Sequence, residues 1–312
     1  MTATWGWVAF GVLIAVLLAV DLGVLHRRGH VVPTRQAAYW AAGWVSLALL
    51  FNVFVLVTRG LAPALQFTTG YLIEESLSVD NIFVFVVVLG WFRVPAEHHH
   101  RVLFWGVLGA LVLRGIMIGA GTVLLAEAHW VIYVFGAFLV YTAYRMAWTS
   151  EVSVDPSHNP VLRLARRFLP LTHGYVEDRF VVREPGPDGR MRRLFTPLFV
   201  VLLVIESTDV VFALDSIPAI FAVTRDPFII YTSNVFAVLG LRSLYFVLAG
   251  AVRRFTELRP ALSIVLGFVG AKMLLSGWIE IPIGVSLGVV AGVLAGAVVL
   301  SLWRERRGAA PA

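Results

Sequence analysis

Two stretches decide the fold: residues 72–82, LIEESLSVDNI, and residues 204–218, VIESTDVVFALDSIP. Each lies in an apolar run long enough to cross a bilayer, and each places three acids inside it. The acids are Glu74, Glu75 and Asp80 in the first stretch, and Glu206, Asp209 and Asp215 in the second. A carboxylate in hydrocarbon costs several kcal/mol, about 2.5–3.5 on insertion scales. The pattern therefore predicts a membrane protein that uses these acids on something that crosses the membrane.

The composition agrees with this interpretation. The chain has 312 residues, of which 59% are hydrophobic and 14% charged, and its mean hydropathy is +0.84. A soluble domain would carry about 25% charged residues. The absence of cysteine excludes disulfides, thiolate metal sites and iron–sulfur clusters. The net charge of +6 is better explained by topology signals than by a nucleic-acid partner.

Apolar stretches of about 20 residues predict the number of spans. We predict an all-α polytopic membrane protein with nine transmembrane helices in a single transmembrane domain, residues 1–312. The stretches are 5–25, 37–57, 65–91, 102–124, 129–148, 196–222, 230–251, 261–278 and 282–303. Alternate connections hold 20 of the 25 Lys and Arg residues, and two lie on the other side. Because basic loops stay cytoplasmic, we expect the N-terminus outside and the C-terminus in the cytoplasm. We expect the membrane to be the bacterial plasma (inner) membrane.

One long polar segment, 149–195, joins the two acidic halves. It is basic and rich in proline and glycine, and we interpret it as a cytoplasmic linker. Residues 161–169 could instead form a basic amphipathic helix on the inner leaflet.

The halves resemble each other, with 65–148 as a first repeat and 196–278 as a second. Asp80-Asn81 matches Asp215-Ser216, an acid lies six residues before each aspartate, and each copy has a later Leu-Arg pair. Because each copy contains three spans, its orientation reverses, which predicts a three-plus-three inverted repeat with a binding site near the midplane. The six-residue acid spacing and Pro218 also predict that both acidic helices are broken.

The buried charges indicate the sign of the ligand. Six acids face three intramembrane bases, Arg114, Arg242 and Lys272, so the surplus favours a cation. We expect the bases to balance charge. The available ligands are carboxylates, amides, hydroxyls and backbone carbonyls, which favour Mn²⁺, Mg²⁺ or Ca²⁺ without choosing among them. His98-His99-His100 reads as part of a solvated loop.

The acidic strings, together with 233–246, SNVFAVLGLRSLYF, closely resemble the TerC/Alx family of integral membrane proteins. The resemblance runs from about residue 5 to residue 303 and is interrupted at 149–195. It implies a LysE-like transporter associated with Mn²⁺ efflux and tellurium resistance. The resemblance places the family's intramembrane acids at Glu75, Asp80, Asp209 and Asp215, with Asn81 and Asn234 beside them.

These observations predict a transporter, not an enzyme, that exports a divalent cation with Mn²⁺ as substrate and without a bound cofactor. Asp80, Asp209 and Asp215 are the expected first ligands, with Glu75, Asn81 and Asn234 assisting. Glu74, Glu206 and Asp21 are further candidates. Proton coupling and a homo-oligomer stay open, as do two other functions: an exporter of amino acids or tellurium oxyanions, and a non-transporting membrane adaptor.

Overall fold

The structure is a computed structural model, and it describes residues 3–25, 33–128, 130–148, 159–172, 174–185, 191–248, 258–279 and 281–306. The helices are α1 (Ala3–Leu25), α2 (Thr34–Arg59), α3 (Leu61–Trp91), α4 (Ala96–Glu127), α5 (Val131–Trp148), α6 (Pro160–Phe168), α7 (Pro197–Phe221), α8 (Pro227–Leu248), α9 (Leu258–Leu275) and α10 (Ile283–Arg306). A hairpin of β1 (Val181–Pro185) and β2 (Met191–Phe195) precedes α7. The chain is therefore an all-α polytopic membrane protein with one small β-hairpin.

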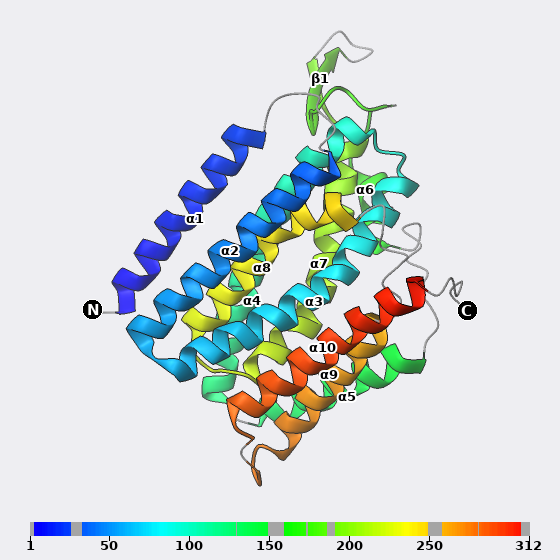
Figure 1. Cartoon of the computed structure of the whole chain (residues 1–312). Helices are drawn as coiled ribbons and strands as arrows, with labels where there is room; N and C mark the ends of the chain where they lie inside the picture. The colour runs from blue at the N-terminus through cyan, green and yellow to red at the C-terminus, as the bar shows by residue number, and fades with distance from the viewer. Residues whose placement is uncertain are drawn as a thin grey trace.

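Each of the nine predicted stretches overlaps one helix of 18 residues or more among the described residues. Six of these helices, α2, α4, α5, α7, α8 and α10, are long and apolar enough to cross a membrane by length and composition. Helix α3 carries three acids and is not among the six. In Figure 1, α10 and α9 lie beside α5 on one side of the bundle, and α1 and α2 lie on the other.

The prediction that the acidic helices are broken is wrong. Helix α3 continues through Glu74 and Asp80, and α7 continues through Asp209 to Phe221. Pro218 lies in the last turn of α7, where the donor that proline lacks removes only one intrahelical bond near the helix end.

The segment 149–195 is more than a linker where the structure describes it. Its helix α6 buries Leu162 and Ala165 in a hydrophobic cluster with residues of α3 and α7. The Tyr175 hydroxyl donates to the carbonyl of Phe92 at 2.8 Å, and burial raises the pKa of this phenol. Helix α6 and the hairpin lie at one end of the bundle, opposite the α9–α10 connection (Figure 1).

Candidate functional site

Four helices meet at the guanidinium of Arg114, which projects from α4 and is 1% exposed. It contacts both acidic helices: its Nη1 pairs with Glu74 of α3, and its Nη2 and Nε contact Asp209 of α7 at 2.9 and 3.3 Å. Asn234 of α8 completes the group, because its amide donates to Glu74 at 2.9 Å and its carbonyl accepts from Arg114 at 3.3 Å. We call these four residues the Arg114 cluster.

The Arg114 cluster carries two carboxylates on one guanidinium. All four side chains are buried, so solvent screens their charges weakly. Arg114 holds Asp209 in a two-pronged arrangement that fixes the direction of both side chains. The formal charge with both acids ionised is one negative unit, which a cation or a proton would neutralise.

Several buried oxygens beside the acids have no hydrogen-bond partner among the described atoms. They are Glu75 Oε2, Ser78 Oγ and Asn81 Oδ1 on α3, and Glu206 Oε2 and Ser216 Oγ on α7. Buried polar atoms are normally paired, and an unpaired one requires an explanation. Asn81 follows Asp80, and Ser216 follows the matched aspartate Asp215, so the feature occurs at the same position in both predicted repeats.

The structure does not gather all the predicted ligands in one place. Asp215 is half-buried and accepts from Thr142 of α5 at 3.2 Å, outside the Arg114 cluster. Asp80 is half-buried and Arg242 is buried, and both have interaction partners. Within the described ranges, no group of three His, Cys, Asp or Glu side chains could hold a metal ion.

The two remaining glutamates lie next to the cluster in sequence and have neighbours of their own. Glu75 accepts a hydrogen bond from Tyr71, one turn earlier on α3. Glu206 packs so closely on Gly109 of α4 that a Cβ there would overlap its carboxylate. Any larger residue at position 109 would therefore require the Glu206 carboxylate to move. Sequence reasoning missed both Tyr71 and Gly109. A small residue within a predicted span was the one available signal for Gly109.

The other candidates lie elsewhere. Lys272 of α9 donates to Ser286 of α10 at 2.9 Å and is not part of the Arg114 cluster. Asp21 lies on α1, and its side chain falls outside the described part of the structure.

The histidine triplet is not a solvated loop, because it forms the first turns of α4. His98 is 7% exposed and its Nδ1 lies 2.6 Å from Asp178, which follows α6 in the chain. His99 contacts the carbonyl of Val94 at 3.0 Å and the hydroxyl of Tyr245 at 3.1 Å. The contact of His98 with Asp178 attaches the segment between α5 and α7 to the bundle, whereas the contacts of His99 connect the start of α4 to Val94 and to α8.

Comparison with known proteins identifies the family and several relatives of the chain. The family model described as integral membrane protein TerC family matches residues 59–309. An uncharacterized membrane protein of Myxococcus xanthus, STKORF319, is 52% identical over 300 residues, covering 96% of this chain and 92% of that protein. A protein of Escherichia coli K12 named "Putative membrane-bound redox modulator Alx" is 46% identical over 306 residues, covering 95% and 94%. A membrane protein of Rickettsia felis is 37% identical over 299 residues. No solved structure matches.

Proposed function

Because the chain belongs to the TerC family of integral membrane proteins, we propose that it exports a divalent metal cation, with Mn²⁺ as the substrate that the sequence resemblance favours. The observation that supports this most is the pairing of two buried carboxylates with one guanidinium in the Arg114 cluster. Charged groups at this depth are rare in membrane proteins and belong to ion or substrate pathways.

The unpartnered oxygens support a cation that prefers oxygen ligands. The buried oxygens Asn81 Oδ1 and Glu75 Oε2 on α3, and Ser216 Oγ and Glu206 Oε2 on α7, accept no hydrogen bond from the described part of the structure. Amide and carboxylate oxygens suit Mn²⁺, Mg²⁺ and Ca²⁺. In our proposal Asp80, Asp209 and Asp215 approach these oxygens in the cation-bound conformation, and Arg114 shifts its pairing as the ion enters.

The packing of the helices supports an inverted repeat of α3–α5 and α7–α9. In such a repeat α3 corresponds to α7 and α4 corresponds to α8. The contact between α3 and α8 should therefore have a counterpart between α7 and α4, and both contacts exist. At the α5–α9 contact, a Cβ on Gly270 would lie 2.8 Å from the carbonyl of Gly136, and Ser263 donates to the carbonyl of Ala143 at 2.8 Å. A shift of 127 residues, which also relates Arg145 to Lys272, maps the first of these contacts onto the second.

Alternating access would then come from rocking of one repeat, α3–α5, against the other, α7–α9. The arginine-rich end that carries α6 is the cytoplasmic end in this proposal. There Asn159, the N-cap of α6, donates to Ser207 of α7 at 3.0 Å, two residues from Asp209. Ser207 lies ten residues into α7, about 15 Å from its start. In our proposal, helix α6 closes the cytoplasmic approach to Asp209 in this conformation.

Proton coupling is part of the proposal. A carboxylate that binds a metal must first lose its proton. The same acids would therefore bind the cation on its way out and a proton on its way in.

The name of the Escherichia coli relative suggests a redox role as a second function. This chain contains no cysteine, so it has no thiols with which to exchange electrons. A redox effect would therefore be indirect, through the cellular level of a redox-active metal such as manganese. An exporter of oxyanions or amino acids would need a positive site, in contrast to the Arg114 cluster.

The test is a manganese-toxicity assay in cells that lack their own manganese exporters. The wild-type chain should lower cellular manganese and restore growth, and Asp80→Asn and Asp215→Asn should lose both effects. Glu127→Gln, an exposed acid at the end of α4, is the matched control and should behave as wild type. Full export by both aspartate variants would refute the site, and equal rescue by an unrelated membrane protein would refute transport.

A further inference from the structure

A cavity of about 520 Å³ lies at the end of the bundle opposite α6, where the α7–α8 and α9–α10 connections meet α3. Its walls include Gln66, Thr224, Arg225, Lys272, Ser276 and Ile283. The walls come from both repeats and from the start of α10. This cavity is separate from the Arg114 cluster, none of whose members line it.

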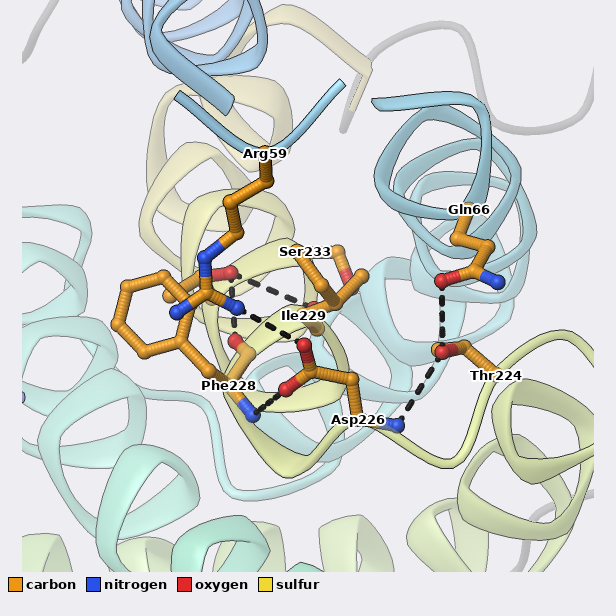
Figure 2. A network of polar contacts seen from close by, with 8 residues as sticks. Arg59, Gln66, Thr224, Asp226, Phe228, Ile229 and Ser233 are labelled. Carbon is orange, nitrogen blue, oxygen red and sulfur yellow. Dashed lines mark hydrogen bonds and ion pairs between the residues drawn. The ribbon is translucent and has the colours of Figure 1, made fainter. Parts of the chain in front are cut away.

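The charged residues that line this cavity are all basic within the described structure. Lys272 and Arg225 line it, and neither forms an ion pair with an acid among the described residues. The nearest acid in sequence, Asp226, is already occupied: it pairs with Arg59 at 2.8 Å and accepts from the amide of Phe228 at 2.9 Å (Figure 2). The cavity therefore has a net positive lining.

Lys272 is in an unusual electrostatic position. Its ammonium donates to Ser286, which lies in the first turns of α10, and Ile283 at the start of that helix lines the same cavity. The N-terminus of a helix carries about half a positive charge and unpaired amide donors. A lysine ammonium next to it is repelled unless an anion lies between them.

Polar groups on α3 and on the α7–α8 connection contribute the rest of the polar lining. Thr224 donates its hydroxyl to the side-chain oxygen of Gln66 at 2.8 Å and accepts from the amide of Asp226 at 3.2 Å (Figure 2). This arrangement uses the oxygen of Gln66 as acceptor and leaves its amide nitrogen as a donor. Two cations, a helix N-terminus and an amide donor are the groups that oxyanions bind in proteins.

We propose that this cavity is a binding site for a phosphate-type oxyanion, held between Lys272, Arg225 and the N-terminus of α10. Two sources share this chemistry, free inorganic phosphate and the headgroup of an anionic lipid in the outer leaflet. The site is independent of cation export, since it uses none of the proposed cation ligands and Lys272 donates to Ser286 and lines this cavity, outside the Arg114 cluster.

Glu280 needs a separate variant, because it lies in the α9–α10 connection and outside the described residues. If its carboxylate served as the counter-ion of Lys272, the site would be filled from within the chain. The variant Glu280→Gln addresses this, because removal of an internal counter-ion would create phosphate binding that the wild type lacks.

The experiment measures binding of inorganic phosphate to the purified full chain in detergent by calorimetry at constant ionic strength. Lys272→Gln should weaken binding about tenfold or more, the usual effect of one charge-assisted hydrogen bond. The control Arg183→Gln removes the same charge from β1 at the other end and should bind as wild type. Thermal stability in nanodiscs of phosphatidylglycerol against phosphatidylcholine forms the second arm.

The two arms separate the sources. Phosphate binding in detergent that Lys272→Gln weakens identifies a free oxyanion. Stabilisation by phosphatidylglycerol that is lost in Lys272→Gln, without binding of phosphate, identifies a lipid headgroup. Equal behaviour of wild type and Lys272→Gln in both arms overturns the proposal, and so does phosphate binding that occurs only in Glu280→Gln.

Discussion

Arg114 on α4 and Asp209 on α7, 95 positions apart in the sequence, form a buried two-pronged ion pair, with Nη2–Oδ1 at 2.9 Å and Nε–Oδ2 at 3.3 Å. The same guanidinium also pairs with Glu74 on α3. One side chain thus connects the acidic helices of the two proposed repeats. A movement of one repeat against the other must change this pairing, so the pair links the site to the proposed rocking.

The first prediction concerns stability. Arg114→Gln leaves two carboxylates buried without their cation, and removal of one partner of a buried ion pair costs about 3–5 kcal/mol. The thermal unfolding midpoint in detergent should fall sharply. Arg179→Gln is the control, because Arg179 is 65% exposed and its 3.4 Å pair with Glu177 is worth about 0–1 kcal/mol. Equal midpoints for the two variants would contradict the structure.

A second prediction concerns Gly109. Gly109→Ala places a methyl group against the carboxylate of Glu206 and should displace it, lowering transport and the unfolding midpoint. Gly119→Ala, on the same helix, has no heavy atom within 4 Å of the new Cβ and should gain about 0.5–1 kcal/mol from reduced backbone freedom. The comparison fails if both substitutions have the same sign of effect on stability.

The third prediction tests the contact between α5 and α9. Gly270→Ala places its Cβ 2.8 Å from the carbonyl of Gly136, so α5 and α9 must separate and the protein should be less stable. Gly267→Ala on α9 meets only the Cβ of Ala143 at 3.6 Å, an ordinary contact, and should be tolerated. Unfolding midpoints in detergent distinguish the two. A Gly270→Ala protein as stable as wild type would show that the helices do not approach this closely.

A fourth prediction addresses α6. Cysteines at positions 159 and 207 replace the hydrogen-bonded pair of Asn159 and Ser207, and the natural chain contributes no other cysteine. Their oxidation should lock α6 on α7 and stop transport, and reduction should restore it. The single cysteine variants are the controls. Transport that continues at full rate with the disulfide formed would show that α6 is not a gate.

Hydropathy predicted much of this architecture, because a bilayer imposes a length and a composition on each span. It placed the acids at Glu74, Asp80, Asp209 and Asp215 inside helices. It could not choose which acids Arg114 would pair with, since that depends on how four helices pack. The six-residue acid spacing and Pro218 wrongly indicated broken helices. Helix α3 is continuous, and Pro218 lies in the last turn of α7, where a missing donor removes only one intrahelical bond.

The segment between α5 and α7 was the least predictable part. Residues 161–169 showed the amphipathic pattern that became α6, yet the apolar face packs on α3 and α7 rather than on lipid. Nothing local indicated that His98 would meet Asp178, 80 residues away. Such long-range contacts depend on the final positions of the helix ends, which single-sequence patterns do not contain.

The most direct test of the central claim is manganese flux through the purified chain in proteoliposomes with an outward manganese gradient. The account predicts flux well above protein-free vesicles for the wild type and for Glu127→Gln. It predicts at least a tenfold loss for Asp209→Asn in protein that elutes as wild type from a sizing column. Asp209→Asn moving manganese at the wild-type rate, or a folded wild-type chain that moves none, would contradict it.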